Sequence, residues 1–471
     1  MPTKSQADAD FYRQHSPPPI PPLSTRRAGV LLPVASLPGA PASGTLGADA
    51  RRFVDFLAES GFSVWQMLPI GPGESPYHSR ATHAGDPRLL DPGELVGDEE
   101  TEGYEAFCAA RRGWLEDYAL FTALSEAQGG SVWCDWPEAL RDRERTALRK
   151  ARRVHADAIE QVRRAQFRFE KQWKALRDYA RARAVLLFGD LPVFVSLNSA
   201  DVWAHREYFR LKPDGRPAVV AGVPPDYFSA EGQRWGNPLY DWERLERDDF
   251  AWWVDRVATQ LARFDLLRID HFRGLQACWE IPADSPSARH GRWVEVPGRE
   301  LFEAVHARCG RGKLVAEDLG SITPEVVALR DSLDMPGMFI LQFAFDGGRD
   351  NPYLPHNHAR NAVVYTGTHD NDTTVGWWNG LDAEARARVC AYFDRDDAPM
   401  PVTLIRASYA SVAQLSVIPM QDLLRLGSAA RLNTPGTADG NWSWRFGWDQ
   451  LPPELAGSQR RLLSIYERLA V

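Results

Sequence analysis

The chain has 471 residues, of which 44% are apolar and 25% charged, values that are ordinary for a globular protein and allow one large, elaborated domain. Its net charge of −8 gives no electrostatic reason to expect nucleic acid or an anionic membrane surface as a partner. The five cysteines are odd in number and widely spaced, and no apolar run of about 18 residues occurs, so we expect no disulfide framework, zinc site or membrane span.

Residues 1–24 end in a proline-rich run at 17–22, which predicts an extended or disordered lead-in. Such a run is either a ligand for a proline-binding partner or a tail without one. The polar start lacks the apolar core of a signal peptide, so the cytoplasm is the expected compartment. We expect residues 25–471 to form a single domain.

Strand-like and helix-like segments alternate from residue 28 onward. Residues 28–37 and 63–70 are predicted strands, and residues 49–60 a helix that ends at Gly61. Alternation of this kind favours a parallel sheet covered by helices.

Residues 138–188 contain neither glycine nor proline. Apolar side chains recur there at steps of three and four, which predicts a helix with one buried face: Val154, Ala158, Val162, Ala165, Phe169, Trp173 and Leu176. Arginines interleaved with acids cover the rest, and we interpret them as a solvated face. At about 1.5 Å per residue an unbroken helix would be too long for one barrel helix, so we expect it to bend or split.

Residues 202–244 are rich in glycine, proline and aromatic residues and predict a long segment without regular structure. Such segments are usually functional or disordered, and the aromatic residues argue against disorder. The remaining predicted elements are helices at 248–264, 300–309, 323–333, 382–393 and 402–415, strands at 337–345 and 417–424, and a closing helix that ends near residue 469.

Four short β-rich runs each end in acidic residues. They lead into Asp190, into Asp270, into Glu317 and into His369 followed by Asp370. Acids at the carboxyl ends of several parallel strands are typical of the active site of a (β/α)8 barrel. The fold class that we predict is therefore α/β, a (β/α)8 TIM barrel with insertions that form accessory subdomains at the C-terminal face of the barrel, at about 71–180, 196–245 and 375–415.

Arg268 and Asp270 lie two residues apart in one of these runs. The period of two in a strand points both side chains to the same face, where the arginine keeps the carboxylate ionised and fixes its rotamer. A lone pair of this kind is more often a structural ion pair. The recurrence of acids at the other strand ends favours a carboxylate nucleophile instead.

With these residues assembled, the sequence resembles the 4-α-glucanotransferases known as amylomaltases or disproportionating enzymes, which are related to the α-amylase clan. The resemblance covers residues 28 to the C-terminus and is carried by several long blocks: Ser75-Pro76-Tyr77, Gly189-Asp190, residues 199–203, 224–228, 233–239, 268–274, 316–320 and 366–374, and Gly440-Asn441-Trp442. Asn198 departs from the family pattern, because an acid is expected there.

The resemblance implies a role for each candidate residue. Asp270 is the expected nucleophile, Glu317 the general acid/base and Asp370 the third carboxylate. The expected substrate-binding residues are Tyr77, Asp190, Tyr227, Phe228, Trp235, Asn237, Arg268 and His369. Glu317 follows apolar Ala316 and has no adjacent cation in sequence, so we expect a raised pKa, as a general acid requires. No metal site and no cofactor are expected, and Asp318 is expected to point away from the site.

The expected reaction is the retaining transfer of an α-1,4-glucan segment from a malto-oligosaccharide, amylose or glycogen-derived dextrin to the 4-hydroxyl of a glucan or of glucose. A hydrolase of the same clan and a catalytically silent glucan-binding barrel are the alternatives. The silent barrel is disfavoured because all three carboxylates are present. Tyr227 and Phe228 form either a lid over the site or part of the barrel rim, and Tyr77 either stacks on a sugar or anchors its turn.

Overall fold

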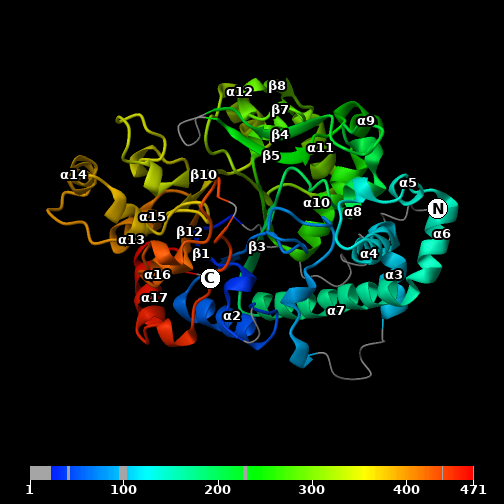
Figure 1. Cartoon of the computed structure of the whole chain (residues 1–471). Helices are drawn as coiled ribbons and strands as arrows, with labels where there is room; N and C mark the ends of the chain where they lie inside the picture. The colour runs from blue at the N-terminus through cyan, green and yellow to red at the C-terminus, as the bar shows by residue number, and fades with distance from the viewer. Residues whose placement is uncertain (1–22, 40–42, 95–102, 226–230, 438, 470–471) are drawn as a thin grey trace.

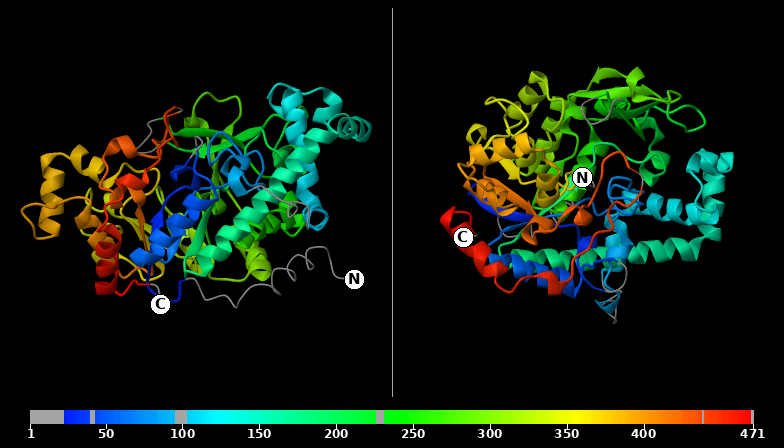
Figure 2. Two further views of the ribbon diagram at one scale, coloured as in Figure 1. Left: turned by 90° about the horizontal axis from the view of Figure 1, so that it is seen from below. Right: turned by 60° about the vertical axis from the view of Figure 1, so that its left-hand side comes forward.

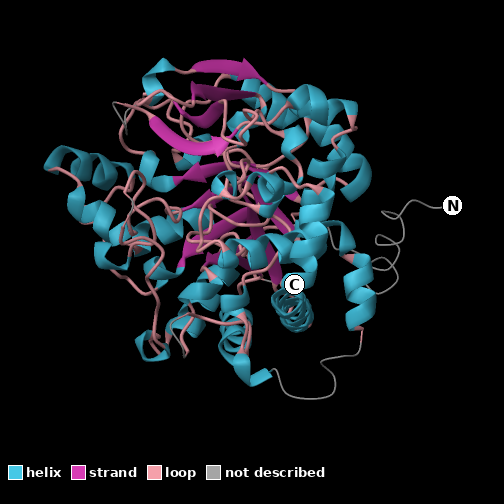
Figure 3. Ribbon diagram, turned by 45° about the vertical axis from the view of Figure 1, so that its right-hand side comes forward, coloured by secondary structure: helices cyan, strands magenta, loops and turns pink. Residues whose placement is uncertain are grey.

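The computed structural model describes residues 23–39, 43–94, 103–225, 231–437 and 439–469. Its centre is a sheet of eight strands that are all parallel, in the spatial order β10-β11-β12-β1-β2-β3-β6-β9 (Figures 1 and 3). The strands are β1 (Arg27–Leu31), β2 (Val64–Gln66), β3 (Leu186–Leu191), β6 (Leu266–Ile269), β9 (Leu314–Ala316), β10 (Gly337–Ile340), β11 (Ala362–Tyr365) and β12 (Leu415–Pro419). The two ends of the sheet meet where the Ala316 amide donates to the Pro336 carbonyl over 2.9 Å, which confirms the predicted (β/α)8 barrel.

Alternate residues of the strands fill the barrel with apolar side chains. This inner cluster is fully buried and draws on every strand: Leu31, Val64, Leu68, Phe188, Leu266, Val315, Met338, Ile340, Val363, Tyr365, Leu415 and Val417. The residues between them point outward and pack under the surrounding helices. A packed interior of this kind leaves function to the loops at the carboxyl ends of the strands.

Four strands were predicted to be longer than the structure shows, and the one predicted at 63–70 is limited to Val64–Gln66. The prediction for residues 28–37 was wrong beyond Leu31, because Pro33 precedes a short 3-10 helix at Val34–Ser36. The strand predicted at 337–345 ends at Ile340, and the one at 417–424 gives way after Pro419 to the short helix α16 (Met420–Leu423). An apolar run continues into the buried barrel rim, so hydrophobicity alone does not mark the end of a strand.

The long helical stretch splits, as predicted. It forms α5 (Glu138–Arg141), α6 (Arg145–Val154) and α7 (Ala156–Arg181), and the last of these packs against α4 (Arg112–Ala127). Val154 was wrongly assigned to the buried face: it is 62% exposed, because it ends α6 at the turn. Helices α3 (Tyr104–Ala110), α4, α5 and α6 form a group around one end of α7, on the right of Figure 1 and of both views in Figure 2.

The prediction that residues 202–244 lack regular structure was wrong. They contain α8 from residue 200 (Ala200–Ala204), β4 (Val219–Val223), β5 (Gln233–Pro238) and α9 (Trp242–Arg247). The two strands join β7 (Ala277–Pro282) and β8 (Arg292–Glu295) in a second, antiparallel sheet that lies at the top of Figures 1 and 3. The sequence analysis missed this sheet because its strands come from two different connections of the barrel, β4 and β5 from the one between β3 and β6, and β7 and β8 from the one between β6 and β9.

The other helices lie close to their predicted positions. They are α2 (Ala48–Ser60), α10 (Ala251–Arg263), α11 (Gly298–Cys309), α12 (Pro324–Ser332), α14 (Ala383–Tyr392), α15 (Val402–Ala410) and α17 (Leu455–Ile465), whereas α13 (Thr374–Gly380) was not predicted. Residues 1–22 of the expected lead-in lie outside the described residues, and the boundaries expected for the insertions stay a prediction. Over the part of the chain that the structure describes, no helix is both long and apolar enough to pass through a bilayer.

Candidate active site

The acids singled out in the sequence follow strands that lie on one side of the barrel. Asp190 is the penultimate residue of β3, Asp270 directly follows β6, and Glu317 directly follows β9. Three strands that are hydrogen-bonded neighbours in the sheet therefore supply one acid each. Asp370 lies in the loop after β11. Parallel strands bring these carboxyl ends to the same rim of the barrel.

Arg268 joins two of the acids. Its Nη1 lies 2.6 Å from Oδ2 of Asp190 and its Nη2 lies 2.9 Å from Oδ1 of Asp270, so the predicted same-face pair forms and a second carboxylate completes it. The side chains of Arg268 and Asp190 are 3% and 0% exposed, whereas that of Asp270 is 26% exposed. The buried pair is therefore a support beneath Asp270, and Asp270 is the acid that a ligand can reach.

Glu317 is held by backbone amides. The amide of His271 donates to Oε2 over 2.7 Å, and that of Leu319 donates to Oε1 over 3.2 Å. His271 adopts the left-handed region at φ 49°, which turns its amide towards the carboxyl group. Burial raises the pKa of Glu317 to about 8, while Arg268 opposes and Asp270 reinforces the rise. The expected rise in the pKa of Glu317 is confirmed. That Arg268 is a nearby cation was not expected, because the two residues are far apart in the sequence.

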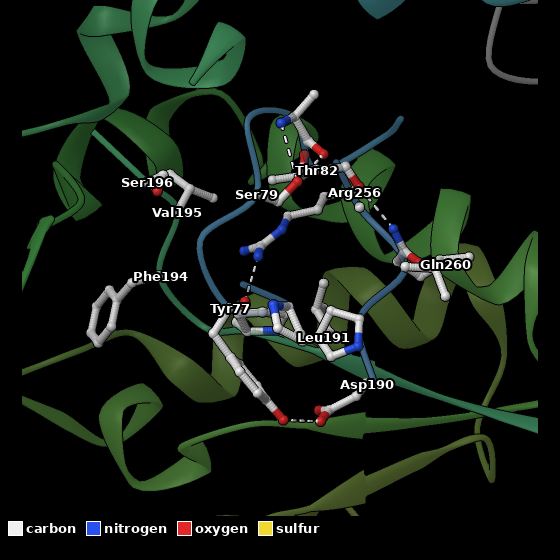
Figure 4. A pocket seen from close by; sticks show the side chains of 16 residues that line it. Tyr77, Ser79, Thr82, Asp190, Leu191, Phe194, Val195, Ser196, Arg256 and Gln260 are labelled. Atoms are coloured by element: carbon white, nitrogen blue, oxygen red, sulfur yellow. Dashed lines mark hydrogen bonds between the residues drawn. The ribbon is translucent and has the colours of Figure 1, made fainter. Parts of the chain in front are cut away.

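Tyr77 and His369 lie between Asp190 and Asp370 and link these two acids through a chain of polar contacts. The Tyr77 hydroxyl donates to Oδ2 of Asp190 over 2.7 Å, as Figure 4 shows, and lies 2.8 Å from Nε2 of His369. Burial raises the pKa of Tyr77 well above its usual value, so the hydroxyl keeps its single proton. Because that proton goes to Asp190, Nε2 of His369 is assigned as the donor to the Tyr77 oxygen, and it lies 3.3 Å from Oδ2 of Asp370.

A small cavity of about 30 Å³ lies behind Tyr77 and Asp190 (Figure 4). Its walls come from the loop that carries Tyr77, from the segment after β3, and from Arg256 and Gln260 of α10. Its volume is close to that of one water molecule and far below that of a sugar ring. This cavity therefore belongs to the support of the site and not to its opening.

The remaining predicted residues differ in their surroundings. The ring of Trp235 meets that of His271 edge-on, with centroids 4.8 Å apart, so it lies beside the acid rim. Asn237 is buried and its amide donates to the Val195 carbonyl over 2.9 Å, which fixes the chain after β3. Asp318 accepts from the Met338 amide over 2.8 Å and pairs with Arg330, so it is engaged away from Glu317.

Tyr227 and Phe228 lie outside the described residues. The chain enters that segment from β4 and leaves it into β5, the strand that carries Trp235. Their assignment to substrate binding stays a prediction.

Two further residues reach the site from the C-terminal part of the chain. Asn433 donates from Nδ2 to Oδ1 of Asp370 over 2.5 Å. The ring of Trp442 lies against those of Tyr77 and His369, with centroid distances of 5.8 and 6.0 Å. Gly440-Asn441-Trp442 was noted as a family block without a role, and nothing local in the sequence pointed to Asn433, which is 63 residues from its partner.

Asn198, the departure from the family pattern, lies in the segment between β3 and α8. Its Oδ1 accepts from the Trp133 amide over 3.3 Å, so it ties the helical insertion to the segment that follows β3. Among the described residues, no three His, Cys, Asp or Glu side chains gather as a metal site would require.

A parallel eight-stranded barrel with an arginine-bound carboxylate, a buried protonated acid and a third carboxylate at its C-terminal rim belongs to the class of (β/α)8 barrel enzymes. The family model described as 4-alpha-glucanotransferase (Glyco_hydro_77) matches residues 32–102 and 94–449. The chain is a member of this 4-alpha-glucanotransferase family.

Relatives of known name belong to the same family and match this chain over most of their length. The 4-alpha-glucanotransferase of Thermus thermophilus is 45% identical over 94% of this chain and 99% of its own. The chloroplastic/amyloplastic 4-alpha-glucanotransferase of Arabidopsis thaliana is 42% identical over 97% of this chain and 88% of its own.

Solved structures agree with the fold. The amylomaltase from Streptococcus agalactiae, solved in complex with acarbose, has a TM-score of 0.90 at 34% identity and covers 94% of this chain and 100% of its own. An Anoxybacillus α-amylase has a TM-score of 0.51 at 11% identity over 95% of this chain and 79% of its own, which shows the barrel fold alone.

Proposed function

We propose that this chain transfers α-1,4-glucan segments by a retaining double displacement, with Asp270 as nucleophile, Glu317 as general acid/base and Asp370 as the third carboxylate. The single observation that carries this division of roles is the contrast between two neighbouring acids. Asp270 is bound to a guanidinium, whereas burial raises the pKa of Glu317 to about 8. Glu317 is thus protonated at neutral pH and can act as the acid, while Asp270, ion-paired with Arg268, is the carboxyl group placed to attack.

In the first step, Glu317 gives its proton to the glycosidic oxygen of the donor glucan while Asp270 attacks the anomeric carbon. The bond to the leaving sugar breaks, and a glycosyl ester forms on Asp270. Arg268 holds Oδ1 of Asp270, so Oδ2, which has no partner among the described residues, is the attacking atom. In the second step the 4-hydroxyl of an acceptor gives its proton to ionised Glu317 and attacks the ester, which restores the α-linkage.

The surrounding residues support the sugar at the reacting position. We assign Tyr77 to stacking beneath that ring, because its hydroxyl is anchored by Asp190 and its position is fixed by Trp442. His369 and Asp370 offer a donor and an acceptor to sugar hydroxyls, and the Asp370 side chain is 45% exposed for that purpose. Trp235 is assigned to the acceptor side because it packs beside His271, and Asn237 acts through the backbone of Val195.

Substrates follow from the family and from its named members. We propose malto-oligosaccharides, amylose and glycogen-derived dextrins as donors, and glucans or glucose as acceptors. The complex of the Streptococcus agalactiae relative with acarbose supports a glucan-like ligand in this site. A cytoplasmic location is also part of the proposal, supported by the five free thiols, Cys108, Cys134, Cys278, Cys309 and Cys390.

The test is incubation of the purified chain with maltotriose, followed by separation of the products. Transfer yields glucose together with a ladder of longer malto-oligosaccharides. Short sugars alone would mean hydrolysis, and unchanged maltotriose would mean a binding protein; either result contradicts the proposal.

A further inference from the structure

The segment at residues 431–442, which follows α16 and is here called the C-terminal segment, holds Asp370 at two points. Arg431 donates from Nη2 to the main-chain carbonyl of Asp370 over 2.7 Å and from Nε to the carbonyl of Asn433 over 2.6 Å. Asn433 then donates from Nδ2 to Oδ1 of Asp370 over 2.5 Å. One arginine thus fixes the backbone of both partners, and the amide reaches the carboxylate itself.

The direction of the Asn433 contact follows from chemistry. An ionised carboxylate only accepts hydrogen bonds, so the amide atom that faces Oδ1 is the NH2 group. Oδ2 lies 3.3 Å from the protonated Nε2 of His369. The Nε2 proton of His369 points to the Tyr77 oxygen at 2.8 Å, so among the described residues Asn433 is the side-chain donor that fixes the Asp370 carboxylate, which is 45% exposed and would otherwise rotate.

We propose that Asn433 is a positioning residue that orients Asp370 for transition-state binding, with Arg431 as its backbone anchor. The proposal rests on the function proposed above, in which Asp370 binds sugar hydroxyls more tightly in the transition state than in the ground state. Asn433 touches Asp370 and not the reacting atoms. Its loss therefore acts on kcat through the geometry of that carboxylate, while the other contacts to the substrate persist.

A purely structural role for Asn433 is the competing explanation, and the chain offers a matched control for it. Asn441 lies in the same segment and makes hydrogen bonds within it. Its Oδ1 accepts from the Thr434 amide over 2.9 Å, and its Nδ2 donates to the Thr437 carbonyl over 3.0 Å. Asn441→Ala removes loop contacts without removing a contact to Asp370. The kcat of this variant therefore measures how much activity is lost when the segment is loosened but the contact to Asp370 is kept.

The experiment compares Asn433→Ala, Asn441→Ala and the unmodified chain in the disproportionation of maltotriose, with kcat and KM measured separately. Because a hydrogen bond to a charged group is lost, Asn433→Ala is expected to lower kcat about ten- to a hundredfold with KM within about twofold. The same loss is expected with an α-glucosyl fluoride donor, since Asp370 acts on the sugar and not on the leaving group. Asn441→Ala is expected to lower kcat less than about threefold.

Asn433→Asp adds a readout that a structural role would not move. Near neutral pH it places a second carboxylate beside Asp370, so its kcat falls below that of Asn433→Ala. As the pH falls, a proton shared by the two carboxyl groups replaces the lost donor. The ratio of the Asn433→Asp rate to the Asn433→Ala rate is therefore expected to rise at least fivefold between about pH 7 and pH 5.

Three results would overturn the assignment: an unchanged kcat in Asn433→Ala, an equal loss in Asn441→Ala, or a ratio that stays flat with pH. Failure of the proposed function is separate, because the unmodified chain would then form no ladder from maltotriose.

Discussion

Asp270 and Glu317 are carboxyl groups at the ends of adjacent strands, and their surroundings give them opposite tasks. The Arg268 guanidinium is ion-paired with Oδ1 of Asp270 at 2.9 Å, and the Asp270 side chain is 26% exposed, so ligands can reach it. Burial raises the pKa of Glu317 to about 8, and two backbone amides fix its rotamer. Separation of two similar groups by environment is the usual way in which one site supplies both a nucleophile and an acid.

The nucleophile assignment predicts the behaviour of Asp270→Asn. Removal of the attacking oxygen prevents the glycosyl ester from forming, so turnover of maltotriose is expected to fall at least a thousandfold, roughly, while glucan binding persists. Turnover by product separation and binding by calorimetry check the two parts. More than about a per cent of the activity would contradict the assignment, once mass spectrometry has excluded deamidation back to aspartate.

The acid assignment predicts how Glu317 responds to donor and to pH. Since an α-glucosyl fluoride has a leaving group that needs no proton, Glu317→Gln is expected to lose transfer from maltotriose but to keep the first step with the fluoride. In the unmodified chain the protonated form is present below the raised pKa. The rate with maltotriose is therefore expected to fall as pH rises through about 8, and the first step with the fluoride is not. Equal losses with both donors would show that Glu317 is not the acid.

At the scale of elements, local sequence patterns predicted which side chains share a face of one strand. Contacts that depend on which strands pair could not be predicted until the fold was known. The period of two placed Arg268 and Asp270 on one face, and the contact of 2.9 Å agrees. That Asp190 is the second partner of Arg268 depends on β3 pairing with β6, which no local signal carries. The contact between Asn433 and Asp370 was harder still to predict, because Asn433 lies in a segment without regular structure.

The closing helix shows how a single side chain fixes an element. Arg468, just beyond α17, is fully buried, pairs with no carboxylate of the described residues, and donates to five carbonyls: those of Arg27, Tyr409, Ser411, Ala413 and Gln414. These carbonyls belong to the start of β1 and to the chain that leads from α15 into β12. The helix therefore closes the barrel where its first and last strands meet.

We expect Arg468→Met to lower the free energy of unfolding by about 3 kcal/mol or more, because it orphans several buried carbonyls at once. Arg460→Met is the control: Arg460 lies in α17, is exposed, and within the described ranges donates to the carbonyls of Ala58 and Glu59 alone. Urea unfolding measures both, and the activity per folded molecule is expected to stay unchanged. Equal stability of the two variants would contradict the closing role.

For the whole molecule, the choice between transfer and hydrolysis is the property that no single carboxylate decides. Water is always abundant, so a transferase must keep it from the ester on Asp270 until a sugar arrives. We propose that Tyr227 and Phe228, which follow Pro224 and Pro225, form a lid that excludes water and stacks on the acceptor; the alternative is that both rings pack into the barrel rim. The segment that carries them starts from β4 and ends in β5, whose Trp235 lies beside His271 at the acid rim.

A lid and a rim-packing role predict different results for Tyr227→Ala and Phe228→Ala. If the rings only support the rim, both reactions fall together, as is expected for the control Trp293→Ala, which removes a partly exposed ring from β8 of the same second sheet. If they form a lid, transfer falls while hydrolysis holds or rises, because water then reaches the ester more easily than the acceptor does. New reducing ends measured beside released glucose give the ratio of hydrolysis to transfer. We expect that ratio to rise severalfold in both lid variants and to stay constant in Trp293→Ala; a constant ratio in all three would leave Tyr227 and Phe228 as rim residues.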